Sequence, residues 1–255
     1  MRQFVLAPVV VVLASLASTG HAAVTLKLDG YALTNSLGAI TSIGSGPANS
    51  ASNAANSRTM GWQVNSIGTT VIQDIAGQFG GTKVEAGLTK PFAAYCTELN
   101  QGFNPFPTGS LTYDVVNGAT YFSATVYDRV GRLYSENIVF DTAEKNAAFQ
   151  IALWETIYET TTTLAVGDGN LAGSADFRTV AGGTATAATF ALAQTYLNNI
   201  ATTTFDKSKV AIVVYTNPTS QDLIVAIPES STYMMMFGGL LAIGALGAYR
   251  ARGQR

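Results

Sequence analysis

Apolar stretches at the two ends of the chain confine its folded domain to the residues between them. The first lies within residues 1–23 and the second within residues 233–249. Apolar residues make up 47% of the 255 residues and charged residues only 12%, which is enough apolar material for a substantial core. The sequence therefore divides into an N-terminal targeting segment, a domain at 24–227, and a C-terminal tail at 228–255.

Residues 1–23 have the three parts of a secretory signal peptide. Arg2 supplies the positive charge, and the apolar run from Val5 to Leu16 is too short for a comfortable membrane span. Gly20 and Ala22 are the small residues expected at a cleavage site. We therefore expect the export machinery to carry the chain across the membrane, and signal peptidase to remove this segment.

The exported part contains no histidine and one cysteine. His21 is the only histidine, and it lies in the segment that is removed. Its loss excludes Ser-His-Asp and Cys-His catalysis and the usual zinc and copper ligands. A formal net charge of -2 excludes a polybasic nucleic-acid binder. We expect a protein that is not an enzyme, with no metal, no cofactor and no nucleic-acid partner.

The tail at 228–255 combines a Pro-Glu pair, an apolar span and a basic end. Pro228 and Glu229 precede a short polar spacer, and Tyr233 to Tyr249 is a 17-residue apolar stretch at the lower limit of a membrane-spanning helix. The basic residues that follow favour a cytoplasmic end. They are Arg250, Arg252 and Arg255.

This order of parts resembles the PEP-CTERM sorting signal of Gram-negative bacteria that produce exopolysaccharide. The resemblance covers 28 of 255 residues, with Ser230 in place of the usual second proline. It implies an exosortase-type membrane enzyme that recognises the tail and releases or transfers the protein at the surface. The implied location is a transient anchor in the inner membrane, followed by the cell surface or the extracellular matrix. A plain tail anchor is the alternative.

The domain at 24–227 shows more strand patterns than helix patterns. Asn117-Gly118 separates Leu111–Val116 from Ala119–Val126, which predicts a hairpin with a type I′ turn. Further predicted strands are Val24–Leu28, Val71–Ile75, Ile138–Phe140, Val210–Tyr215 and Asp222–Ile227. We expect a mainly β fold, a β-sandwich or a β-barrel, with one or two packed α-helices.

Two helices are predicted. Asp141 and Glu144 have the spacing of a capping box, which predicts a helix from Thr142 to about Thr160. A second helix is expected from about Ala185 to Asn198.

Cys96 and Gln150 are the one pair of residues in which we find reactive chemistry. On the predicted helix, Gln150 shares a column with Ala147 and Trp154, so its carboxamide borders the core. A Cys96 thiolate beside that carboxamide could attack its carbonyl, expel ammonia and leave an internal thioester. The alternative is that Cys96 is a small core residue and Gln150 bonds to a loop.

The surroundings of this pair resemble the thioester (TQXA) domains of bacterial surface adhesins. Phe149 stands where that family usually has Thr, and Thr97 stands where it usually has an aliphatic residue. The resemblance implies covalent adhesion to an amine-bearing surface ligand, and Glu98 is expected to orient the site. The matching positions are Tyr95, Cys96 and Glu98, then Gln150, Ala152, Leu153 and Trp154.

Two other classes of function stay open. One is a passive structural protein of the exopolysaccharide or biofilm, whose thiol pairs between chains. The other is a carbohydrate-active hydrolase that uses a carboxylate pair such as Glu155 and Glu159. We expect that pair on a solvated helix face, which makes the hydrolase the least favoured class. A sugar-stacking face on the sheet is a further hypothesis, built from Tyr113, Tyr121, Tyr127 and Tyr134.

Overall fold

The computed structural model describes residues 23–36, 39–45, 47, 49–64, 68–99, 101, 109–159, 161–167, 177–180 and 183–228. Pro228 is the last described residue. Residues 1–22 of the predicted signal peptide lie outside the described residues. So do Glu229, the predicted span from Tyr233 to Tyr249, and Arg250, Arg252 and Arg255. Among the helices that are described, none is both long enough and apolar enough to cross a membrane.

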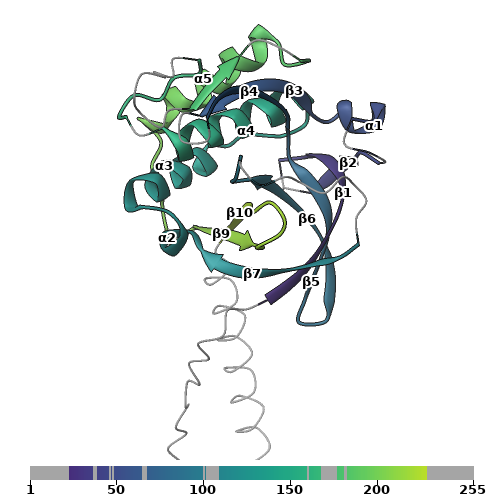
Figure 1. Ribbon diagram of the computed structural model, residues 1–255. Helices are drawn as coiled ribbons and strands as arrows, with labels where there is room; N and C mark the ends of the chain where they lie inside the picture. The colour runs from purple at the N-terminus through teal and green to yellow at the C-terminus, as the bar shows by residue number, and fades with distance from the viewer. Residues whose placement is uncertain are drawn as a thin grey trace, which may run out of the picture.

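Antiparallel strands close into a six-stranded barrel because the last strand of the sheet pairs with the first (Figure 1). The strand order is β1 (Ala23–Thr34), β5 (Phe79–Glu85), β6 (Leu88–Cys96), β10 (Leu223–Pro228), β9 (Val210–Thr216) and β7 (Leu111–Asn117). β7 closes the barrel by pairing Leu111 with Leu26 and Asp114 with Ala23. A short strand, β2 (Ile40–Ile43), extends the sheet beside β1.

The period-two pattern of β1 explains why this segment forms a barrel strand. Val24, Leu26 and Leu28 are buried, whereas Thr25 and Lys27 between them are more exposed. Side chains alternate between the two faces of a strand, so this pattern places one face on the core. The prediction of a mainly β fold with packed helices is therefore confirmed. Of the two predicted forms, sandwich and barrel, the structure has the barrel.

α4 (Ala143–Tyr158) lies between the barrel and a second sheet (Figure 1). That sheet has the order β4 (Gly68–Ala76), β3 (Arg58–Val64) and β8 (Phe177–Val180). α3 (Ala124–Ser135) and α5 (Ala187–Ile200) pack against α4. Every α4 residue from Asn146 to Thr156 is buried, because neighbours cover the helix on all sides. The predicted helix is thus confirmed, but its N-cap is Thr142 rather than Asp141, which pairs with Lys145 instead.

The hairpin predicted around Asn117-Gly118 is wrong. Asn117 caps a short helix, α2 (Gly118–Tyr121), and its side chain accepts a hydrogen bond from the Ala119 N–H at 2.8 Å. The segment that follows forms α3 instead of a strand. β7 takes its partners from β1 and β9, which are distant in sequence, so no local partner is needed. A Cβ at Gly118 would lie 2.8 Å from Ile212 Cγ2, which explains the glycine.

The remaining strand predictions are confirmed with one exception. Val71–Ile75 lies in β4, Val210–Tyr215 in β9, and the last predicted strand in β10. Ile138–Phe140 is not a strand, although the Phe140 carbonyl accepts a hydrogen bond from the Thr34 N–H at 2.8 Å. The second predicted helix is α5, with its N-cap at Thr186.

Candidate functional site

The end of β6 leaves the main chain of Cys96 without a partner strand on one side. β5 begins at Phe79, which pairs with Ala94, so β5 stops short of Cys96. On the other side, β10 continues, and Leu223 lies opposite Cys96. The Thr97 N–H donates to the Asp222 carbonyl at 3.0 Å, so the N–H and C=O of Cys96 point away from β10. These groups are buried, and buried backbone groups need partners.

The Gln150 carboxamide takes the place of the missing strand. Its Oε1 accepts from the Cys96 N–H at 2.9 Å, and its Nε2 donates to the Cys96 carbonyl at 2.9 Å. Both residues are only 1% exposed. A carboxamide has the same donor and acceptor as a peptide group, so Gln150 acts as a one-residue extension of the sheet. The structure thereby brings Cys96 and Gln150 into direct contact.

The thiol of Cys96 lies in a dry environment. Its Sγ donates to the Glu98 carbonyl at 2.7 Å. Burial raises the pKa of Cys96 well above its ordinary value, and the negative charge of Asp74 adds to that rise in pKa. Cys96 is therefore a protonated thiol at neutral pH. It is also the only cysteine of the chain, and its burial disfavours the predicted alternative of a disulfide between chains.

The other residues of the predicted motif lie around this pair. Tyr95 precedes Cys96 on β6, and its hydroxyl donates to Asn146 Oδ1 at 2.8 Å. Ala152 and Trp154 are buried in α4. Glu98 contributes mainly through its carbonyl, which holds the thiol, because its carboxylate accepts from the Asp222 N–H at 3.2 Å.

Two residues of the site were not predicted from the sequence. The Tyr158 hydroxyl accepts from the Leu99 N–H at 3.0 Å, and Tyr158 follows Gln150 and Trp154 along α4 at intervals that keep one helix face. That spacing could have predicted Tyr158 as a residue of the site. Asp222, which follows the β9–β10 turn, accepts from the Tyr121 hydroxyl at 2.9 Å and lies beside Glu98. No local pattern marks Asp222.

The hydrogen bonds of Cys96 suit an attack of its sulfur on the carboxamide. Attack at Gln150 Cδ places negative charge on Oε1, which already accepts from the Cys96 N–H. A fixed backbone donor aimed at the oxygen that gains charge is the arrangement of an oxyanion hole. Nε2, the nitrogen that would leave, is held by the Cys96 carbonyl. The contacts thus place a backbone donor at the oxygen that would gain charge, whereas the thiol proton is directed to the Glu98 carbonyl.

Burial of Asp222 predicts a measurable pH dependence of stability. Because burial raises the pKa of Asp222, the folded chain binds its proton more tightly than the unfolded chain does. Its contribution to stability is full below the ordinary carboxylate pKa and is lost as pH rises through the raised value. From about pH 4 to pH 7 we therefore expect Asp222→Asn to gain stability relative to the wild type, measured by chemical unfolding.

The control for this prediction is Asp206→Asn. Hydrogen bonds from Ser208 and Lys209 lower the pKa of Asp206, so its stabilising effect is lost as pH falls. Below about pH 4 the Asp206 variant must therefore change in the opposite direction, and from pH 4 to pH 7 its difference in stability from the wild type must stay nearly constant. A difference between wild type and Asp222→Asn that does not vary with pH contradicts the prediction.

The expectation that Glu155 and Glu159 lie on a solvated helix face is wrong. Glu155 is 0% and Glu159 is 5% exposed. Glu155 Oε1 accepts from the Ala165 N–H at 2.8 Å, and Glu159 Oε1 accepts from the Thr161 N–H at 2.7 Å. Both carboxylates bind the loop that follows α4. These contacts to the backbone give no support to a carboxylate pair for glycoside hydrolysis.

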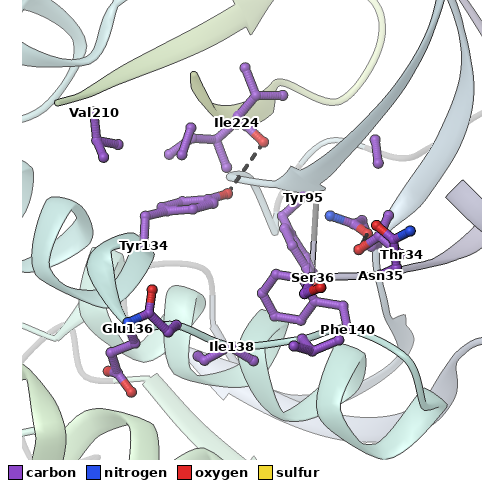
Figure 2. A pocket seen from close by; sticks show the side chains of 16 residues that line it. Thr34, Asn35, Ser36, Tyr95, Tyr134, Glu136, Ile138, Phe140, Val210 and Ile224 are labelled. Carbon is purple, nitrogen blue, oxygen red and sulfur yellow. Dashed lines mark hydrogen bonds between the residues drawn. The ribbon is translucent and has the colours of Figure 1, made fainter. Parts of the chain in front are cut away.

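A cavity of about 820 Å³ lies beside β6 and β10, next to the loop that joins α3 and α4 (Figure 2). Its walls include Tyr95, Tyr134, Phe140 and Ile224, and the Tyr134 hydroxyl donates to the Ile224 carbonyl at 3.4 Å.

The hypothesis of a sugar-stacking tyrosine face is wrong, because Tyr113 and Tyr127 are buried and Tyr127 lies on a helix.

Comparisons with known proteins identified no relative of this chain. The chain matches no protein-family model, and no curated protein or solved structure is significantly similar to it. Within the part of the chain that the structure describes, no cluster of three or more metal-binding side chains is present.

Proposed function

We propose that this chain is an exported surface protein that attaches covalently to its target through an internal thioester between Cys96 and Gln150. The paired hydrogen bonds between the Gln150 carboxamide and the main chain of Cys96 carry the proposal. They hold the electrophilic carbon beside the residue that bears the nucleophile, in a buried position that excludes water. The resemblance to thioester adhesin domains supports the same pair.

The chemistry needs no catalyst from outside the chain. The Cys96 sulfur forms a bond to Gln150 Cδ, the Cδ–Nε2 bond breaks, and the thiol proton leaves with the nitrogen as ammonia. An amine on a surface ligand later attacks Cδ, the C–S bond breaks, and the amine's proton restores the thiol. The product is an amide that links Gln150 to the ligand. Each molecule reacts once, which is adhesion and not enzyme turnover.

The two ends of the chain support an extracellular location. The signal peptide directs export, and the tail that begins at Pro228 and Glu229 resembles a signal for an exosortase-type enzyme. We therefore place the protein transiently in the inner membrane of a Gram-negative bacterium, and then at the cell surface or in the matrix. Its partners there are surface polysaccharide or an amine-bearing ligand.

The intact mass of the exported protein tests the proposal. The full chain is secreted from a Gram-negative host and purified without reductant or added amine. We expect the peptides bearing Cys96 and Gln150 to be linked, with a mass lower by one ammonia. Methylamine then adds once, at Gln150. The same spectra show whether the tail after Glu229 has been removed.

Two variants complete the test. Cys96→Ala must have its full mass and must not react with methylamine. Gln150→Glu must also have its full mass, since no ammonia can leave. A wild-type protein with its full mass, and with a thiol that alkylates on unfolding, would overturn the thioester.

A passive structural protein of the exopolysaccharide matrix is the second candidate. The observation that favours it is the same pair of bonds, because the unreacted carboxamide already satisfies both backbone groups of Cys96. In that case Gln150 is a purely structural residue, and the mass experiment finds no missing ammonia.

A further inference from the structure

Trp154 carries a buried polar group with no ordinary partner. The residue is 1% exposed, and among the described residues its indole Nε1 has no hydrogen bond of normal geometry. Trp154 lies one helical turn after Gln150, on the face of α4 that contacts Cys96. An orphaned N–H in a native core calls for an explanation.

The nearest explanation is the sulfur of Cys96. As a hydrogen-bond donor the Trp154 indole lowers the pKa of Cys96, against the larger effect of burial, although no bond of normal geometry joins the two. A neutral thiol is a weak acceptor, and its own proton is already directed to the Glu98 carbonyl. The N–H therefore gains little while the sulfur is neutral. A thiolate is a much stronger acceptor, and no water competes for it in a buried site.

We propose that the indole N–H of Trp154 is the hydrogen-bond donor that stabilises the Cys96 thiolate as the thioester opens. The inference rests on the proposed function and adds a catalytic residue to it. When an amine nitrogen bonds to Gln150 Cδ, the C–S bond breaks and its electron pair goes to Sγ. Trp154 donates to that sulfur until the proton from the amine restores the thiol. An interaction that is strong only for the charged leaving group accelerates the step.

The first experiment measures the thiol without any thioester chemistry. Gln150→Glu cannot lose ammonia, so the Cys96 thiol stays free to titrate. In this background, the ¹³Cβ shift of Cys96 is followed by NMR as pH rises, with and without Trp154→Phe. We expect the thiol to titrate at a higher pH without the indole. The carboxylates that oppose the thiolate are Asp74, Glu98 and the one introduced at position 150, and all three are the same in both proteins.

The second experiment measures the reaction. In a protein that has Gln150 and forms the thioester, Trp154→Phe is expected to slow methylamine uptake about tenfold, because hydrogen bonds to charged groups are among the stronger ones. Trp62→Phe is the matched control, since Trp62 also has a buried Nε1 without a normal partner but lies beside Asp74. That control is expected not to slow the reaction, because loss of the Trp62 indole raises the pKa of Asp74 and so weakens the charge that opposes the thiolate.

The outcomes separate this inference from the proposed function. A full wild-type mass means that no thioester forms, yet the titration still decides whether the indole donates to the sulfur. An unchanged titration and an unchanged methylamine rate in Trp154→Phe would overturn the inference even if the thioester exists. If Trp154→Phe does not fold, Trp62→Phe leaves Trp154 as the only tryptophan of the chain. Biosynthetic replacement by a benzothiophene analogue then removes the N–H alone, with the same two outcomes.

Discussion

Gln150→Ala is expected to lower the free energy of unfolding by about 3–5 kcal/mol, because it leaves two buried backbone groups without partners and opens a small cavity. The groups are the N–H and the carbonyl of Cys96, each of which bonds only to the carboxamide on the side that β5 does not reach. Urea unfolding in the Cys96→Ala background measures this effect alone, since no thioester can form there and both backbone groups are still present.

Gln194→Ala is the matched control for this loss. Gln194 on α5 also binds two backbone groups with its carboxamide, the Val166 N–H at 2.9 Å and the Leu164 carbonyl at 3.2 Å. That loop is partly exposed, so water replaces the lost bonds and the expected cost is only about 0.5–1.5 kcal/mol. Equal costs for the two glutamines would show that the carboxamide does not complete the sheet at Cys96.

The sequence predicts four of the six barrel strands, β1, β7, β9 and β10, but it predicts neither β5 nor β6 and not which strands pair. The alternation of Val24, Leu26 and Leu28 is enough to place β1, because burial on one face leaves a period of two. Asn117-Gly118 fails as a hairpin signal because Asn is also a favoured N-cap, and β7 pairs with β1 and β9, which are distant in the sequence. A two-residue hairpin turn joins β5 and β6 instead, at Ala86-Gly87, where both residues have positive φ.

The candidate site is also predictable only in part, because local periodicity shows which residues are buried but not which residues they contact. Helical periodicity puts Gln150 on a core-facing column, so its burial follows from the sequence. The point at which β5 stops is a property of the whole barrel, so the bonds from Gln150 to the Cys96 main chain do not follow. The same limit explains Glu155, because its carboxylate is matched to the Ala165 N–H in a loop that no helix pattern reveals.

Phe149→Thr is expected to destabilise the protein by about 3–5 kcal/mol, although it restores the residue usual in thioester adhesin domains. Phe149 is the centre of an aromatic cluster in the core, with its ring centroid 4.7 Å from that of Tyr95 and 4.8 Å from that of Phe140. Tyr134 lies 5.0 Å away on α3. Threonine leaves this volume empty and adds a hydroxyl to an apolar site.

Phe190→Thr is the control, because Phe190 is only partly buried against the core from α5. We expect it to cost less than half as much, since water fills the space that the ring vacates. The mass test on the folded fraction of Phe149→Thr separates stability from chemistry. An unchanged mass deficit in that fraction means that position 149 supports the fold and takes no part in bond formation. A variant as stable as the wild type would contradict the aromatic cluster as the reason that phenylalanine stands beside Gln150.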